Sequence, residues 1–230
     1  MLTVASYNVH KCVGLDRRRD PERIMAVLRE INADIVALQE ADRRFGSRAS
    51  AIPLPLIEQH SPYLAVQFDT RPDSIGWHGN AMLIRKDMAV LRSAIVPLPT
   101  LEPRGAISVD VAVGGAAVRV VGMHLDLSGL RRRHQVRAVC AHVAACGPPL
   151  PLVMMGDLNE WSAHGGALRE FGDGHRVLAP GRSFHARRPI AMLDRIITSA
   201  DVAVQDVGVH HSALSARASD HLPVWTRIII

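Results

Sequence analysis

The chain has 230 residues, 48% of them hydrophobic, which is enough to bury a sizeable core as one domain. No apolar run reaches the about 18 residues that a membrane-spanning helix needs, so a helical integral membrane protein is excluded. The net charge of +5 is compatible with nucleic acid or anionic headgroups as partners, without deciding between them.

The cysteines and the first residues of the chain favour a cytoplasmic setting. Cys12, Cys140 and Cys146 are an odd number in no metal-like spacing, which suits a reducing compartment. Residues 1–8 lack a basic region followed by an apolar stretch, so no export signal is expected. The basic residues are almost all arginine, a bidentate phosphate ligand. A GC-rich genome that favours arginine codons explains this bias equally well.

The first third of the sequence predicts strands that alternate with helices. A loosely alternating strand over residues 3–7 ends at Asn8. Asp20 is a good helix cap with proline after it, and this helix is expected to run to about Glu30. Three further elements follow: a short buried strand, a helix or loop with prolines, and another strand, over residues 34–38, 53–60 and 63–69.

Strand signals dominate the rest of the chain. They lie at residues 80–85, 89–96, 106–113, 117–125, 151–155, 194–198, 202–209 and 224–230. Helices are predicted from Gly129 to Gly147 and over residues 163–171, and residues 172–192 form a loop. So many strands exceed one ordinary open sheet. We therefore predict one domain over residues 1–230, an α/β protein with two sheets in the core and helices outside.

Polar residues recur where the predicted strands meet loops. They are Asn8, Glu40, His124, Asp157, Asn159, Asp194, Asp220 and His221. Any one of them is explained equally well as a turn residue or a cap, but converging strand ends bring such residues into one cleft. Their carboxylates and amides are hard oxygen ligands suited to Mg²⁺ or Mn²⁺, and the histidines suit acid–base chemistry. Together with arginines, this set describes metal-assisted phosphoester hydrolysis.

Short motifs in a fixed order carry a family resemblance along the whole chain. They are SYNVH (6–10), ALQEAD (37–42), GNAML (79–83), GMHLDL (122–127), GDLNEW (156–161), LDRI (193–196) and SDHLPV (219–224). In this order they resemble the endonuclease/exonuclease/phosphatase superfamily. The resemblance implies a four-layer α/β-β/α sandwich, two mixed sheets packed face to face between helices, and hydrolysis of phosphodiesters or phosphomonoesters with Mg²⁺.

The resemblance also implies roles for single residues. Glu40 is similar to the metal-binding glutamate and Asn8 to its neighbour; Asp220 is expected at the metal and also to orient His221. Asp157 resembles the residue that positions water, and Asn159 the amide that holds the phosphate. Asp194 resembles an aspartate near the leaving group or a second metal, and His124 a phosphate-contacting histidine. Abasic-site endonucleases typically carry tyrosine at that last place, so this branch is disfavoured; the histidine is more similar to the deoxyribonuclease, sphingomyelinase and phosphoinositide-phosphatase branches.

Three residues around these motifs are predicted to bind substrate. Asn80 matches a supporting amide, Arg104 leads into a strand from which it reaches the phosphate, and Arg132 opens a helix in a pattern that resembles bacterial members. A surface turn for Arg104 and a solvated helix face for Arg132 are the alternatives. The loops 42–55 and 172–192 are expected to rim the cleft.

The function predicted is Mg²⁺- or Mn²⁺-dependent hydrolysis of an anionic phosphate ester by a monomer, most simply by a phosphodiesterase or nuclease. A phosphomonoesterase or a lipid-headgroup phosphodiesterase of the same fold is the alternative, and so is a degenerate binding protein. Nucleic acid fits the charge, yet aromatic residues make up just 4% and no stacking platform among basic residues is evident. Peripheral membrane association is compatible but not indicated.

Overall fold

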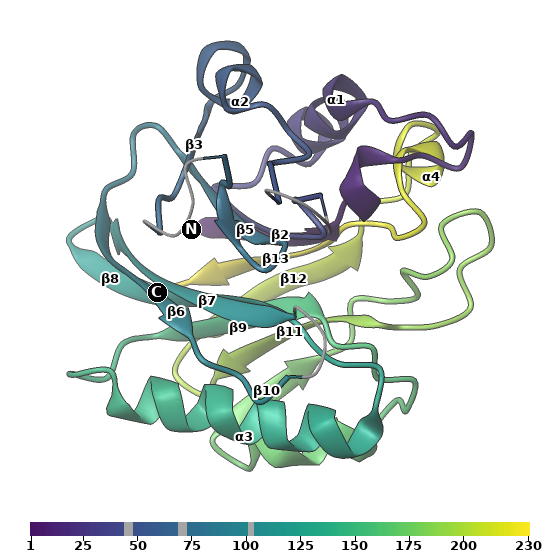
Figure 1. Ribbon diagram of the computed structural model, residues 1–230. Coiled ribbons are helices and arrows are strands. Elements are labelled where there is room, and N and C mark those ends of the chain that lie inside the picture. The colour runs from purple at the N-terminus through teal and green to yellow at the C-terminus, as the bar shows by residue number, and fades with distance from the viewer. Residues whose placement is uncertain (44–47, 69–72, 101–103) are drawn as a thin grey trace.

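Two β-sheets pack face to face with helices on both outer sides (Figure 1). The computed structural model describes residues 1–43, 48–68, 73–100 and 104–230. Within these residues, the first sheet has the order β12-β13-β1-β2-β5-β3, with β4 paired to β5, and the second has the order β10-β11-β9-β8-β7-β6. This confirms the predicted four-layer sandwich.

The strands of the first sheet are β1 (Leu2–Asn8), β2 (Ile35–Gln39), β3 (Tyr63–Ala65), β4 (Gly76–Trp77), β5 (Asn80–Arg85), β12 (Ala203–Val209) and β13 (Val224–Ile229). Those of the second are β6 (Val90–Val96), β7 (Gly105–Val113), β8 (Ala116–His124), β9 (Leu152–Asp157), β10 (His175–Leu178) and β11 (Asp194–Ser199). The helices are α1 (Pro21–Ile31), α2 (Leu54–His60), α3 (Gly129–Ala145) and α4 (Ser215–Ala218), with 3₁₀ turns η1 (His10–Cys12) and η2 (Gly166–Phe171). No helix in the described ranges is long and apolar enough to cross a membrane.

Apolar residues fill three layers. Helices α1, α2 and α4 cover the outer face of the first sheet, and α3 with η2 covers that of the second (Figure 1). Between the sheets lie mainly β-branched residues such as Val4, Val109 and Val153, because inward side chains of facing sheets interdigitate there. Helix α1 begins as predicted: the Asp20 carboxylate accepts a hydrogen bond from the backbone N–H of Arg23 at 3.0 Å.

The strand directions place polar side chains at one edge of the sandwich. β1 runs parallel to β2 in the first sheet, and β8 runs parallel to β9 in the second. Across the interface, β1 packs against β9 and β2 against β8. The carboxyl ends of these four central strands therefore meet, and β11 adds its first residue, Asp194, directly opposite Asp157.

Local structure differs from the sequence prediction in a few short segments. Residues 166–171 form a 3₁₀ turn, not an α-helix, and the predicted loop 172–192 contains edge strand β10. The strand predicted over 63–69 is only three residues long. The turns η1 and α4 were not predicted, since three or four residues carry too little periodicity to be recognised.

Candidate active site

A buried carboxylate, Asp157, lies where the two sheets meet. Its Oδ2 accepts a hydrogen bond from Asn8 Nδ2 at 3.0 Å, and His124 Nε2 lies 3.4 Å from the same oxygen. Burial alone would raise the pKa of Asp157, but the charges of His221 and His124 outweigh it and hold this pKa well below its ordinary value. Asp157 is therefore an ionised carboxylate that is 2% exposed.

Asp157 is aimed by the turn that follows β9. Gly156 has φ 157°, and a Cβ there would lie 1.8 Å from the Met123 carbonyl oxygen, so the GDLN motif requires glycine. Asn159, in left-handed conformation, donates its backbone N–H to Asp157 Oδ1 at 3.0 Å. Its side-chain amide donates to the Leu125 carbonyl at 2.9 Å. The motif thus builds a short rigid turn with a carboxylate and an amide.

His221 forms a dyad with Asp194. Nδ1 of the ring lies 2.8 Å from Asp194 Oδ2, and Nε2 lies 3.7 Å from Asp157 Oδ2. Burial would lower the pKa of His221, but the two carboxylates outweigh it and raise this pKa to about 10. Asp194 also accepts a hydrogen bond from Ser183 Oγ at 2.5 Å, and burial raises its pKa. The ring is therefore an imidazolium between two acidic side chains.

Asp220 does not orient His221, contrary to the sequence prediction. Its Oδ1 accepts a hydrogen bond from Ser219 Oγ at 3.3 Å and lies 3.8 Å from His10 Nδ1. The motif brought Asp220 next to His221 in sequence, but Nδ1 of that ring is taken by Asp194, which comes from another strand. Asp220 remains at the cleft, on the side of η1.

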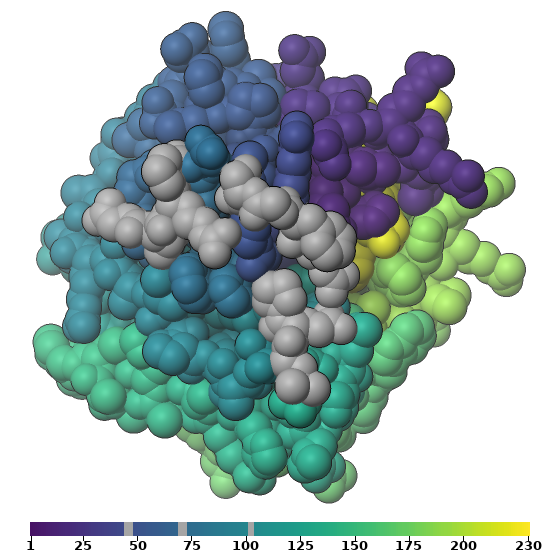
Figure 2. Space-filling view, viewed as in Figure 1, coloured from purple at the N-terminus to yellow at the C-terminus, as the bar shows by residue number. Residues whose placement is uncertain are grey.

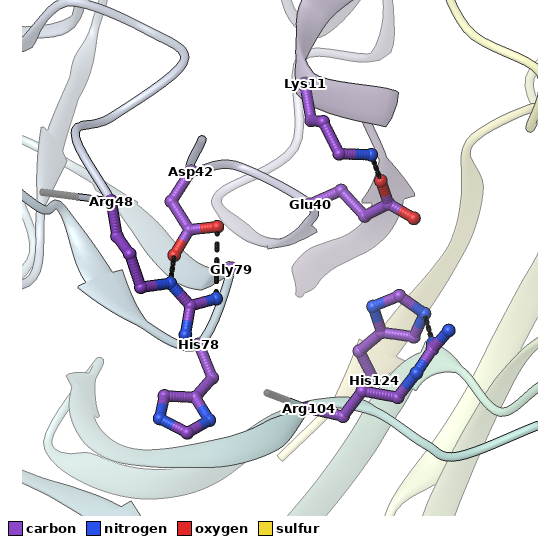
Figure 3. A pocket seen from close by; sticks show the side chains of 8 residues that line it. All are labelled: Lys11, Glu40, Asp42, Arg48, His78, Gly79, Arg104 and His124. Atoms are coloured by element: carbon purple, nitrogen blue, oxygen red, sulfur yellow. Dashed lines mark hydrogen bonds and ion pairs between the residues drawn. The ribbon is translucent and has the colours of Figure 1, made fainter. Parts of the chain in front are cut away.

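A second group of charges lines a pocket around Glu40 (Figure 3). The pocket is lined by Lys11, Glu40, Asp42, Arg48, His78, Gly79, Arg104 and His124. Lys11 Nζ is paired with Glu40, and Arg48 Nε lies 3.1 Å from Asp42 Oδ2. Burial would raise the pKa of Glu40, but the charges of His124 and Lys11 outweigh it and lower this pKa. Residues 44–47 of the rim loop 42–55 lie outside the described residues.

Lys11 reaches Glu40 because the backbone of η1 is left-handed. His10, Lys11 and Cys12 have φ angles of 46°, 57° and 60°, a conformation that costs non-glycine residues roughly 1–2 kcal/mol each. In return, the backbone N–H of Lys11 donates to the Glu40 carbonyl at 3.0 Å, and that of His10 donates to Asn8 Oδ1 at 3.1 Å. From the sequence, His10 and Lys11 are candidates for the rim of the cleft, with ordinary loop polarity as the alternative; their pairing with Glu40 and Asn8 was not predicted, since left-handed turns of ordinary residues leave no pattern.

The three predicted substrate-binding residues occupy different places. Arg104 lines the pocket, contacts His124 Nε2 and donates to the Leu125 carbonyl at 3.1 Å. Asn80 supports the pocket wall, donating to the Gly105 carbonyl at 3.0 Å; its Oδ1 has no hydrogen-bond partner among the described residues. Arg132 is buried, with Nη2 3.2 Å from Glu160 Oε2. Its guanidinium also donates to the carbonyls of Asp126 and Leu127, so Arg132 holds a loop in place instead of facing a phosphate.

The donor groups present fit a hard divalent cation. The side chains of Asn8, Glu40 and Asp220 each present oxygen atoms, the ligands that such a cation prefers, although Lys11 is paired with the Glu40 carboxylate. A second group, Asp157, Asp194 and His221, has potential ligand atoms within 4.8 Å of one another. In that group the imidazolium already supplies the positive charge.

The comparison with known protein families decides what this arrangement is. The model of the Endonuclease/Exonuclease/phosphatase family matches residues 5–221, which include every side chain placed in the cleft. The chain belongs to this family. Members of the endonuclease/exonuclease/phosphatase family are phosphoric ester hydrolases, the enzyme class that the sequence predicted.

The proteins that are similar to this chain have names that describe different properties. The uncharacterized protein YbhP of Escherichia coli strain K12 is 25% identical over 98% of this chain and 95% of its own length. D. rerio TDP2 complexed with a single-strand DNA product has a TM-score of 0.77 at 18% identity, covering 100% of this chain and 99% of that chain. A mannosyl-6-phosphatase of Bacteroides thetaiotaomicron has a TM-score of 0.76 at 20% identity, with both chains covered in full. At these identities the structures share the fold.

Proposed function

We propose that the protein hydrolyses phosphodiesters with the help of Mg²⁺ or Mn²⁺, as one catalytic domain over residues 1–230. The observation that carries this is the ionised carboxylate of Asp157 held between two histidines, one of them the Asp194-paired imidazolium His221. A carboxylate that orients water beside cations that neutralise a phosphate is the pairing required for attack by water on phosphorus.

The residues have distinct tasks in this proposal. Asp157 orients the attacking water, while the imidazolium of His221, positioned by Asp194, neutralises charge that develops on the phosphoryl group. His124, Arg104 and the Asn159 amide hold the phosphate. A divalent cation at Asn8, Glu40 and Asp220 would supply Lewis-acid stabilisation of the phosphoryl oxygens.

The fold neighbours support more than one class of substrate. Among the fold neighbours, TDP2 is named with single-strand DNA and another protein is named a mannosyl-6-phosphatase, so diesters and monoesters both occur on this fold. We place a phosphodiester, including nucleic acid, first because the chain as a whole is basic, with a net charge of +5; the cationic groups around the pocket suit any anionic phosphate ester. A degenerate binding protein is disfavoured, since the carboxylate that orients water, the dyad and the oxygen donors are all present. Free cysteines support a cytoplasmic location, and we expect a monomer.

Hydrolysis across a matched panel tests the proposal. Bis-p-nitrophenyl phosphate, p-nitrophenyl phosphate, single-stranded DNA and sphingomyelin would each be incubated with Mg²⁺, Mn²⁺ or EDTA, with wild type and Asp157→Ala compared. Turnover of a diester that requires the metal and is lost in the variant is expected. If no substrate is hydrolysed and calorimetry detects no Mn²⁺ binding, the degenerate binding protein becomes the better explanation.

Lys11 should weaken metal binding, because its ammonium occupies the Glu40 carboxylate. Lys11→Met is expected to tighten Mn²⁺ binding about five-fold, corresponding to the ~1 kcal/mol of a partly exposed ion pair. Calorimetric titration of the metal-free protein measures this. Lys86→Met is the matched control, since Lys86 donates to the carbonyls of Glu58 on α2 and of Ser61 just after it. Weaker Mn²⁺ binding by Lys11→Met would mean that Lys11 supports the site instead.

A further inference from the structure

Trp161 projects into solvent beside the cleft. It follows Asn159 by two residues and is 64% exposed, one of only three tryptophans in a chain with 4% aromatic residues. Scattered exposed apolar residues are normal on a protein surface. Trp161 differs from such scattered residues because it lies beside a catalytic cleft, on a backbone that is held in place, and next to other aromatic rings.

Buried polar contacts fix the backbone that carries Trp161. The preceding residue, Glu160, is 5% exposed, and its carboxylate accepts hydrogen bonds from the backbone N–H groups of Ser162 and Ala167 at 3.0 and 2.9 Å. Arg132 adds an ion pair at 3.2 Å. The backbone that carries the indole is therefore held by a hydrogen-bonded turn, which reduces the entropy lost when a ligand stacks on the indole.

A second aromatic ring connects Trp161 to the dyad. The ring of Phe184 meets Trp161 edge-on, with 6.3 Å between centroids and 83° between planes. On its other side Phe184 packs against the ring of His221 at 4.9 Å, and its backbone bridges to His221. Two aromatic side chains, distant in sequence, thus lead from solvent to the imidazolium.

We propose that Trp161 is a stacking platform for a nucleobase attached to the scissile phosphate. The inference rests on the proposed function, and it names nucleic acid as the substrate class. The loop that carries Phe184 also exposes Arg182, Arg187 and Arg188, which are suited to backbone phosphates. Aromatic faces beside cationic side chains are how proteins grip single strands without reading their sequence. This platform was missed in the sequence because its parts lie in separate loops.

A lipid surface is the competing occupant of this side of the cleft. Leu127 and Leu130 are 63% and 65% exposed, and Arg132 ties the Leu127 carbonyl to the Glu160 turn. A nucleobase is favoured because Trp161 lies against Phe184, and Phe184 packs on the ring of His221, so a group stacked on Trp161 would lie on the side of the cleft where the phosphate is proposed to bind.

Binding measured in EDTA, which prevents metal-dependent cleavage, distinguishes contacts to the bases from contacts to the backbone. Fluorescence anisotropy would compare an oligothymidylate of about eight nucleotides with an abasic strand of the same length and charge. Wild type is expected to prefer the base-containing strand. Trp161→Ala should reduce that preference about 5- to 150-fold, the range for one base stacked on an aromatic side chain, and Trp161→Phe should retain much of it. Leu91→Ala, an exposed apolar residue on β6, is the control.

Three outcomes would overturn the inference. These are equal wild-type affinity for the two strands, an unchanged preference in Trp161→Ala, or a blue shift of tryptophan emission on phosphatidylglycerol vesicles that Trp161→Ala removes. The last would assign the surface to lipid. Metal-dependent hydrolysis of bis-p-nitrophenyl phosphate by wild type is measured alongside. If it occurs without base preference, only this inference fails; if it does not occur, the proposed function itself fails.

Discussion

Asp194→Asn is expected to lower kcat about 10³- to 10⁴-fold, the scale seen when a carboxylate that orients a catalytic histidine becomes an amide. The change keeps the side-chain shape but removes the charge that faces Nδ1 of His221 at 2.8 Å. Steady-state hydrolysis of bis-p-nitrophenyl phosphate measures the effect. Asp194 acts as a positioning residue, so KM is expected to change much less than kcat.

The titration of His221 gives a second readout for the same variant. Its pKa is raised to about 10 against a burial effect of opposite sign, with Asp194 and Asp157 as the chief causes. Without the Asp194 charge the pKa must fall, which NMR of the ring in metal-free protein detects. Stability provided by the charged ring is fully present below pH 6.5 and is lost as pH rises through about 10. In Asp194→Asn that loss should move to lower pH.

Asp220→Asn is the comparison that decides between two carboxylates. The sequence motif favours Asp220 as the partner of His221, whereas the structure places it 3.8 Å from His10 Nδ1. We expect Asp220→Asn to weaken Mn²⁺ binding and to lower the pKa of His221 less than Asp194→Asn does. A larger fall of that pKa in Asp220→Asn would contradict the dyad described here.

Glu160→Ala is expected to reduce the free energy of unfolding by about 3–5 kcal/mol, the cost of breaking a buried ion pair on one side. The variant leaves the buried guanidinium of Arg132 without its carboxylate and leaves two backbone N–H groups without an acceptor. Urea denaturation measures the loss. Glu170→Ala, which removes ion pairs to the exposed Arg133 and Arg137, is the matched control with little expected change.

A double variant and a pH series sharpen this prediction. Glu160→Gln with Arg132→Met should be less destabilised than Glu160→Ala alone, because no buried charge is left unpaired. Burial would raise the pKa of Glu160, but donors from Ala167, Ser162 and Arg132 outweigh it and lower this pKa. Its contribution is therefore present at neutral pH and lost as pH falls below about 4.3 through the lowered value. Equal stability of Glu160→Ala and wild type would show that the turn is held by other contacts.

The sequence predicted the fold well where hydrophobic periodicity or caps were strong. Asn80–Arg85 matches β5 at both ends, and the Asp20–Pro21 signal marks the start of α1. Short elements with half-exposed residues, such as β10, gave no such signal because edge strands lack a continuous apolar face. The two-sheet architecture followed from the number of strands, but the pairing of β1 with β13 could not, since it joins residues far apart in sequence.

The sequence identified most of the residues of the site, but not which of them contact one another. Strand-end positions identified Asn8, Glu40, His124, Asp157 and Asp194, which the central strands bring together. The contacts between these side chains depend on the direction in which each strand end points. For this reason the adjacency of Asp220 and His221 in the SDH motif wrongly suggested that they are partners. Lys11 at Glu40 and Trp161 beside Phe184 depend on turn geometry and on contacts between loops, neither of which short motifs encode.

The pairing of β13 with β1 has a consequence for synthesis of the protein. Leu2 lies opposite Ile228, so the strand that delivers Asn8 has one open edge until the end of β13 has left the ribosome. A chain interrupted after His221 would contain every residue proposed for catalysis, yet β1 would lack its antiparallel neighbour β13. In Figure 2 yellow atoms, which belong to the last part of the sequence, come to the surface between purple N-terminal and green segments. The sheet that carries Asn8 is therefore expected to form fully only after β13 has been synthesised.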